Sequence, residues 1–169
     1  MKKLLTFKTN RWIKNNKSVR SATDYRKSEE IGFIFTVEDR SKHDVVKNFI
    51  KRLETDGKHV EILAFLPEKA ENHEFLFDFF TKKDVSFWGN YSSELVQKFA
   101  DKTFDYLLHI DFENTDFING ILAMSKAKCR VGTSADQNRF YEMVINMNSS
   151  QRNYQQLADE MYNYISILT

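Results

Sequence analysis

Two apolar runs separated by a helical pattern constrain the fold of this chain more than any other feature. Residues 31–37 read Ile-Gly-Phe-Ile-Phe-Thr-Val, and residues 60–65 read Val-Glu-Ile-Leu-Ala-Phe. Runs this apolar on both faces are typical of strands buried on both sides of a parallel sheet. Apolar residues recur at helical spacing between them, at Val45, Val46, Phe49, Ile50 and Leu53. We therefore predict a βαβ unit over residues 31–65.

Two local signals predict where the helix of this unit begins and ends. Ser41-Lys42-His43-Asp44 resembles a capping box, with a hydroxyl first and an acid three residues later. Gly57 suits the position just beyond the last helical turn. The second strand closes at Pro67.

The rest of the chain continues the alternation. We predict strands at 85–88, 104–110, 128–131 and 143–145, and helices at 91–100, 115–126 and from a cap at Ser150 to the end of the chain. Residues 75–80 are too short to classify by period. With 41% hydrophobic residues and 15 Phe, the chain can fill a core. The prediction is a three-layer, Rossmann-like α/β domain with a mostly parallel sheet of five or six strands.

Charge divides the chain unevenly. Residues 1–30 hold nine Lys or Arg against three acids, a net charge of +6, and the remainder holds 16 basic against 21 acidic residues, a net charge of −5. We therefore predict a basic N-terminal arm over 1–30, with residues 1–17 as a weakly amphipathic helix, and an acidic α/β domain over 31–169.

The arm has several possible uses. Its basic residues, interleaved with Phe7 and Trp12, could contact nucleic-acid phosphates or another anion while an aromatic ring stacks. A helix lying on a membrane surface is an alternative, and so is docking of the arm on its own acidic domain. The basic residues concerned are Lys2, Lys3, Lys8, Arg11, Lys14, Lys17 and Arg20.

A ligand of such a sheet is expected beyond the carboxyl ends of its strands, where the strand order reverses. With an order resembling 3-2-1-4-5, the loops after the first and fourth strands would meet there, close to the loop after the fifth. This crevice would be lined by Glu38, Asp39, Arg40, Ser41, Asp111, Glu113, Asn114, Thr133 and Ser134.

The acids of this crevice allow two interpretations. Carboxylates could bind Mg²⁺ or perform general acid–base chemistry, with Asp111, Asp39 and His109 as the best candidates. His109 and Asp111 lie on one face of a strand, so the acid could orient the imidazole. Acids are also common at helix N-termini, where they offset the helix dipole, and this is the favoured interpretation. We predict no metal and no cofactor.

Several function classes lack their motifs. The loop after the first strand has no glycine, so neither G-x-G-x-x-G nor a P-loop is present. G-x-S-x-G is absent as well. Cys129 is expected to be a buried apolar residue, and His43, His59 and His73 to lie on the surface without metal-ligand spacing. The start of the chain lacks a signal-peptide core and no stretch could span a membrane, so a cytoplasmic location is expected.

Three segments carry a resemblance to known families. Residues 80–89, 104–111 and 123–132 together resemble a family of small uncharacterised Bacteroidetes proteins of about this length. The last two segments also resemble part of the N-terminal half of heptosyltransferases, in which a similar strand, helix and strand occur. Glu38-Asp39-Arg40 stands where that family has a glycine-aspartate turn, and 169 residues cannot hold both of its domains. This resemblance therefore implies the fold rather than the activity.

These observations favour a non-enzymatic binding or interaction protein, with self-association through an exposed aromatic face as one form. The first alternative is a small enzyme or glycosyltransferase-like remnant that binds a nucleotide-sugar or a metal at the acidic crevice. The second is nucleic-acid contact through the basic arm.

Overall fold

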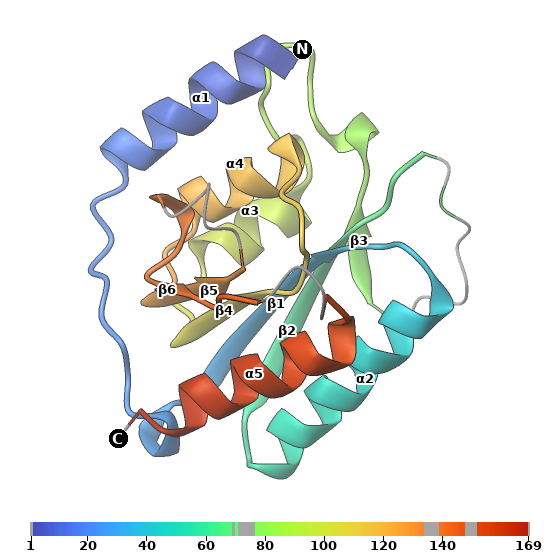
Figure 1. The fold of residues 1–169 in the computed structure, drawn as a ribbon. Coiled ribbons are helices and arrows are strands. Elements are labelled where there is room, and N and C mark those ends of the chain that lie inside the picture. The colour runs from blue at the N-terminus through green and yellow to red at the C-terminus, as the bar shows by residue number, and fades with distance from the viewer. Residues whose placement is uncertain (1, 69, 71–76, 134–138, 148–151, 169) are drawn as a thin grey trace.

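The chain folds around one six-stranded sheet, seen in a computed structural model that describes residues 2–68, 70, 77–133, 139–147 and 152–168 (Figure 1). The strand order is β3-β2-β1-β4-β5-β6, and every neighbouring pair is parallel. The strands are β1 (Glu30–Thr36), β2 (His59–Phe65), β3 (Asp78–Phe80), β4 (Tyr106–His109), β5 (Cys129–Gly132) and β6 (Met143–Val144). The predicted α/β class with a parallel sheet is confirmed, and β1 and β4 are neighbours, as the order assumed for the crevice requires.

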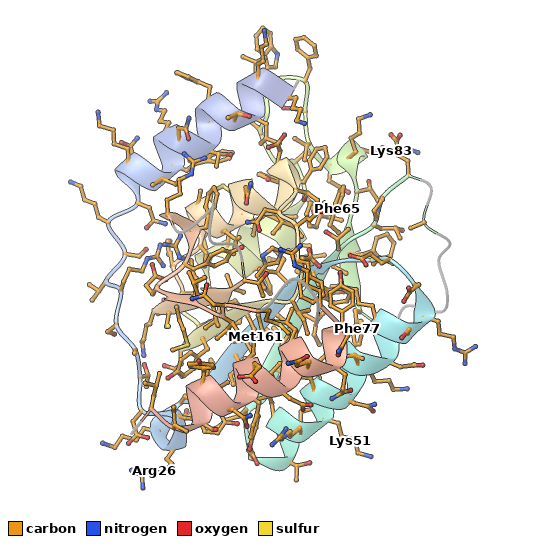
Figure 2. All side chains as sticks on the ribbon, in the orientation of Figure 1. Arg26, Lys51, Phe65, Phe77, Lys83 and Met161 are labelled. Atoms are coloured by element: carbon orange, nitrogen blue, oxygen red, sulfur yellow. The ribbon has the colours of Figure 1, made fainter. Side chains whose placement is uncertain are left out.

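Helices cover both faces of the sheet, which gives the three predicted layers (Figure 1). One face carries α2 (Arg40–Thr55) and α5 (Tyr154–Ser166), and the other carries α3 (Glu94–Asp101) and α4 (Asp116–Met124). Two short 3₁₀ helices, η1 (Tyr25–Lys27) and η2 (Lys82–Asp84), lie in connections. In Figure 2 the side chain of Met161 on α5 points toward the sheet, whereas Lys51 of α2 extends away from it.

Strand β1 is buried on both faces, as its continuous apolar sequence predicts. Phe33 and Phe35 pack in the cluster beneath α2 and α5, and Ile34 packs in the cluster beneath α3 and α4. Gly32 allows the second cluster to pack closely, because a Cβ atom there would lie 2.8 Å from the Phe104 ring. Substituting this glycine would therefore overpack the core.

The end of α2 follows the prediction, but its beginning does not. Gly57 has φ of 80°, the left-handed conformation expected just beyond a helix. The helix starts at Arg40 with Asp39 as its N-cap, and the Asp39 carboxylate accepts a hydrogen bond from the Lys42 amide (2.8 Å). The predicted capping box at Ser41 is wrong, because Asp39 already holds the extended cap conformation two residues earlier.

The predicted strand at 85–88 is a turn instead. Val85 forms only an isolated antiparallel bridge with Tyr91, and the Gly89 amide donates to the Ser86 carbonyl (2.8 Å). Gly89 has φ of 75°, so the chain reverses direction before it can extend. The apolar pattern of this segment comes from exposed aromatic residues rather than from a buried strand.

The last helix begins later than its predicted cap. Asn153 is the N-cap of α5 and accepts a hydrogen bond from the Gln156 amide (2.7 Å). Ser150 lies outside the described residues, as do Ser134, His73 and part of the unclassified segment 75–80.

The N-terminal segment forms α1 (Lys2–Asn15), which packs against α4. Leu5 is 1% exposed and belongs to the core cluster on that face, and the Asn16 side-chain amide donates to the carbonyls of Ala123 and Ser125. The division into an arm over 1–30 and a domain over 31–169 stays a prediction. Among the described residues, no helix combines the length and the apolar character that crossing a bilayer requires.

Candidate functional site

The carboxyl ends of β1 and β4 lie side by side, and Asp111 follows β4 at this point. Its side chain is 2% exposed. The Thr36 amide, at the end of β1, donates to both carboxylate oxygens of Asp111 (3.0 and 2.9 Å). Asp111 therefore joins the two strands at the reversal of strand order, where ligands of such sheets bind.

A buried lysine neutralises this carboxylate. Lys42, in the first turn of α2, places its ammonium group between Asp111 Oδ1 and Glu38 Oε1, the latter at 2.8 Å. Its side chain is 1% exposed, and Nζ lies 4.3 Å from the centre of the Tyr154 ring. The Tyr154 hydroxyl donates to the same Glu38 oxygen (2.6 Å). Only Glu38, with 44% of its side chain exposed, connects this group of charges to solvent.

His109 extends the network across the sheet. Its Nε2 lies 2.9 Å from Asp111 Oδ2, and its Nδ1 lies 2.6 Å from the Tyr141 hydroxyl. The Asn114 side-chain amide donates to that hydroxyl (2.7 Å), which leaves the Tyr141 proton for His109 Nδ1. The hydrogen bonds are mutually consistent when His109 carries its proton on Nε2 and donates it to Asp111.

The electrostatics of the network favour an ionised Asp111 and a neutral Tyr141. Burial opposes ionisation of Asp111, but the neighbouring His109 and Lys42 outweigh it and hold the pKa of the carboxyl below its usual range. Burial raises the pKa of Tyr141 above its usual range. We define Glu38, Lys42, Asp111, His109 and Tyr141 as the buried network.

The other predicted crevice residues have different positions. Asp39 caps α2, Arg40 and Ser41 are exposed on its first turn, and Glu113 is exposed. Thr133 donates its hydroxyl proton to the Asp111 carbonyl (2.7 Å).

Lys42 was missed by sequence reasoning, because a lysine in a helix is usually solvated. Its spacing of four residues from Glu38, which suits an ion pair on a helix, was the available signal.

A groove of about 450 Å³ opens at the same edge of the sheet, between α1 and the start of α4. Phe65 and Phe117 line it, with their rings stacked at 4.9 Å between centres. Two lysines line it as well: Lys2 pairs with Asp116 at 3.7 Å, and Lys82 pairs with Glu68 at 3.5 Å. The remaining lining residues are Leu5, Asn114, Thr115 and Asp116. We call this the carboxyl-edge groove.

A second group of charges lies at the start of β1 and β2. Glu30 and His59 are register partners, and each offers a ligand atom within 4.8 Å of the other and of Glu61. The Lys102 ammonium pairs with both Glu30 and Glu61 and occupies the position between them that a metal ion would need. His59 is exposed, as predicted.

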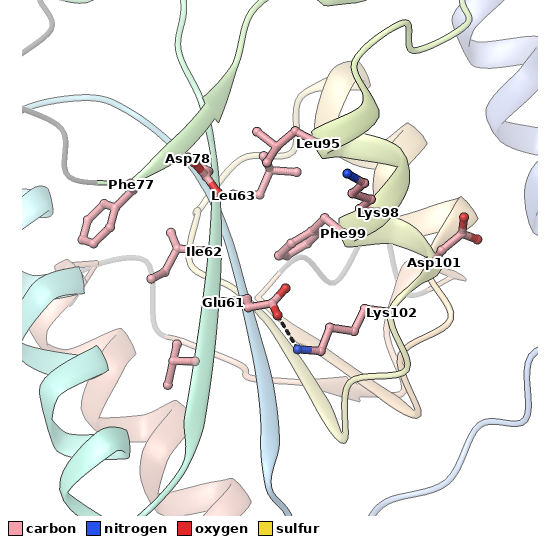
Figure 3. A pocket seen from close by; sticks show the side chains of 11 residues that line it. Glu61, Ile62, Leu63, Phe77, Asp78, Leu95, Lys98, Phe99, Asp101 and Lys102 are labelled. Carbon is pink, nitrogen blue, oxygen red and sulfur yellow. Dashed lines mark hydrogen bonds and ion pairs between the residues drawn. The ribbon is translucent and has the colours of Figure 1, made fainter.

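No local pattern predicted this group, because its members come from β1, β2 and the end of α3. The adjoining pocket, of about 780 Å³, lies between β2 and α3, and Figure 3 shows Glu61 pointing across it to Lys102. We define Glu30, His59, Glu61 and Lys102 as the exposed cluster.

The basic residues of the N-terminal segment divide into two groups. Arg20 is half-buried and donates to the carbonyls of Ala127 and Ser125, so it anchors the segment rather than facing solvent. Lys8 donates to the Asn90 side chain and Lys2 pairs with Asp116. Within the described parts of the chain, the other four have no acidic partner within ion-pair distance: Lys3, Arg11, Lys14 and Lys17.

The single cysteine is confirmed as a buried residue. Cys129 is 1% exposed in β5, and burial raises the pKa of its thiol to about 12. A thiol with so little thiolate at neutral pH is a poor nucleophile.

Comparison with protein-family models finds a match along nearly the whole chain. The sequence model of a protein family described as "Family of unknown function (DUF6913)" matches residues 2–168, which is nearly the whole chain and includes α1. Neither a curated protein nor a solved structure shows significant similarity to the chain.

Proposed function

Since this chain belongs to the Family of unknown function (DUF6913), we propose its function from geometry alone: a non-enzymatic protein that binds a small anionic ligand in the carboxyl-edge groove. The observation that carries the proposal is the lining of this groove, where two lysines stand beside a stacked aromatic pair. Such a lining suits a ligand with one planar apolar part and one anionic group.

The lysines are available to a ligand. The side chain of Lys2 is 86% exposed and that of Lys82 is 46% exposed, and their ion pairs with Asp116 and Glu68 are long. Exposed pairs of this kind contribute about 1 kcal/mol or less, so an anion can replace the acidic partner at small cost.

The burial of the network argues against a catalytic role for its residues. Asp111, His109 and Lys42 are each nearly inaccessible and each paired with protein groups. A general base must reach the proton that it abstracts, and a carboxylate neutralised by a buried lysine is poorly placed to do so.

The test is calorimetric titration of the whole chain with adenosine monophosphate, with adenosine and inorganic phosphate as the two halves of the probe. We expect the intact probe to bind more tightly than either half. Lys82→Glu should raise Kd by about tenfold or more, which corresponds to a loss of about 1.4 kcal/mol. Lys83→Glu, an exposed neighbour on the same turn that does not line the groove, should leave Kd unchanged.

Three outcomes would contradict the proposal. Equal weakening by Lys82→Glu and Lys83→Glu would show non-specific attraction. Turnover of a nucleotide or sugar nucleotide that Asp111→Asn abolishes in a folded variant would establish the enzymatic alternative, including a glycosyltransferase-like remnant. An unchanged Kd in Lys82→Glu would show that the probe binds outside the carboxyl-edge groove.

A further inference from the structure

A pair of large aromatic side chains projects into solvent beside the start of α1. Phe87 is 67% exposed and Trp88 is 66% exposed, and their rings stand nearly perpendicular, at 84° and 5.6 Å between centres. Large aromatic side chains gain free energy on leaving water, so two of them exposed at one tip mark a surface that suits a partner.

The turn that carries this pair is held firmly. The Ser86 amide donates to the Asn90 carbonyl and the Gly89 amide donates to the Ser86 carbonyl, each at 2.8 Å. Gly89 packs so closely on α1 that a Cβ atom there would lie 3.0 Å from Leu5 Cα. The Lys8 side chain ties Asn90 to the helix. The exposure of Phe87 and Trp88 is therefore built into the fold.

The turn touches α1 near Leu5 and Lys8, and the solvent-exposed face of the same helix is basic and also carries an exposed aromatic residue. Lys3, Phe7, Arg11 and Lys14 follow one another at spacings of three or four, which places them on one side of the helix. All four are exposed, and Phe7 is 66% exposed. The first acid in the sequence is Asp24, so no acidic side chain of α1 reduces the charge of this face.

We infer that this surface, made of residues 86–90 and the exposed face of α1, docks on a lipid bilayer that carries anionic headgroups. Tryptophan and phenylalanine are favoured at the boundary between headgroups and acyl chains, where an apolar ring is buried without leaving the interface. Each lysine or arginine near an anionic leaflet adds electrostatic attraction. Phe87 and Trp88 would enter the boundary while Lys3, Arg11 and Lys14 meet the headgroups.

The geometry favours a bilayer over nucleic acid. A single-stranded nucleic acid stacks successive bases on parallel, accessible ring faces along a groove. Here the two rings are perpendicular, so no base can stack on both, and they stand on a projecting turn. A bilayer interface is fluid and accommodates any ring orientation.

The experiment is co-sedimentation of the whole chain with vesicles of phosphatidylcholine alone and of equal parts phosphatidylcholine and phosphatidylserine. We expect binding to the mixed vesicles only, weakened by salt. Phe87→Ser with Trp88→Ser should reduce the partition coefficient by about tenfold or more. The matched control is Tyr164→Ser with Ile167→Ser, which removes exposed apolar side chains from the end of α5 and should have no effect.

Charge is tested in the same way. Lys3→Glu, Arg11→Glu and Lys14→Glu together should reduce binding by about tenfold or more. The control is Lys47→Glu, Lys51→Glu and Lys98→Glu, which makes the same change of net charge on α2 and α3. Circular dichroism and melting temperature establish that each variant is folded.

The remaining outcomes distinguish the rival uses of this surface. Failure to bind mixed vesicles, or equal loss in the test and control variants, would overturn the inference. Loss of single-stranded oligonucleotide binding in the Phe87 and Trp88 variant, without vesicle binding, would assign the surface to nucleic acid. A dimer in light scattering that this variant dissociates would assign it to a second copy of the chain. Lys82→Glu should bind vesicles normally. The test of membrane docking is therefore independent of the test of ligand binding in the carboxyl-edge groove.

Discussion

Two groups of similar side chains stand at opposite ends of the sheet, and they differ chiefly in burial. The buried network joins Lys42 to two acids and a histidine at the carboxyl ends of the strands. The exposed cluster joins Lys102 to two acids and a histidine at the amino ends. The side chains of Lys42 and Asp111 are 1% and 2% exposed, whereas those of Lys102 and Glu61 are 28% and 40% exposed.

This difference shows that the contribution of an ion pair to stability depends on its burial as well as on the residues that form it. In water-exposed surroundings the attraction is weakened by solvent and salt, and removing one partner leaves the other hydrated. In the interior the remaining charge has no water to solvate it, so the loss of one partner is costly. Three variants, one of them also measured as a function of pH, can break or sharpen this contrast.

Lys42→Met should have the largest effect. It leaves Asp111 as a buried carboxylate without its cation, and we expect a loss of about 3–5 kcal/mol in the free energy of unfolding. Urea denaturation followed by circular dichroism measures it. Lys47→Met, on an exposed position of the same helix, controls for the change of residue type. A loss no larger than that of the control would show that the pair is not stabilising.

Tyr141→Phe should have the next largest effect. It removes the hydroxyl that bonds His109 and Asn114, leaving two partly or fully buried groups unsatisfied at a cost of about 1–3 kcal/mol. The same denaturation experiment applies, with the exposed Tyr164→Phe as control. An unchanged free energy of unfolding would mean that water replaces the hydroxyl.

Lys102→Met should cost about 1 kcal/mol or less, because its partners Glu30 and Glu61 remain hydrated. The loss should shrink further in high salt, unlike that of Lys42→Met. Lys98→Met, whose lysine pairs with Glu94 on the surface of α3, is the control. A salt-independent loss as large as that of Lys42→Met would remove the contrast between the two regions.

The smallest expected effect is the pH dependence of the stability that Lys102→Met removes. The hydrogen bond from Lys102 lowers the pKa of Glu30 in the folded state. A carboxyl with a lowered pKa stabilises the fold above its unfolded pKa, and this contribution is lost as pH falls through the folded pKa. The stability difference between the native chain and Lys102→Met should therefore be present at neutral pH and decrease below about pH 4. Denaturation at several pH values measures this, and a difference that grows on acidification would contradict the assignment.

Much of the fold followed from local patterns, and the failures have specific causes. The runs around Phe33 and Leu63 predicted buried strands because a strand covered on both faces must be apolar throughout. Phe87 and Trp88 led to a wrong strand because sequence alone does not distinguish an aromatic residue that is buried from one that is displayed. Ser41 is a plausible cap by residue type, but Asp39 has the extended backbone of an N-cap and its side chain accepts the Lys42 amide.

The candidate site divides in the same way. Asp111 and His109 were predicted together because alternate residues of a strand share a face, and the structure bonds them. Tyr141 and Lys42 were not connected to them, since their contacts join residues 32 and 69 positions apart. The exposed cluster escaped prediction for a related reason, because it depends on the register between β1 and β2.

The sequence by itself determined the α/β class, the parallel sheet and the concentration of positive charge near the N-terminus. These properties follow from apolar periodicity within short segments and from the count of charged residues in each part of the chain. Only the tertiary structure decided that the acids of the carboxyl edge surround a buried lysine, and that Phe87 and Trp88 face solvent beside a basic helix. The physical reason is that burial and partnership depend on segments distant in the chain, and these two quantities decide whether a charge or a ring stabilises the fold or stays available to a partner.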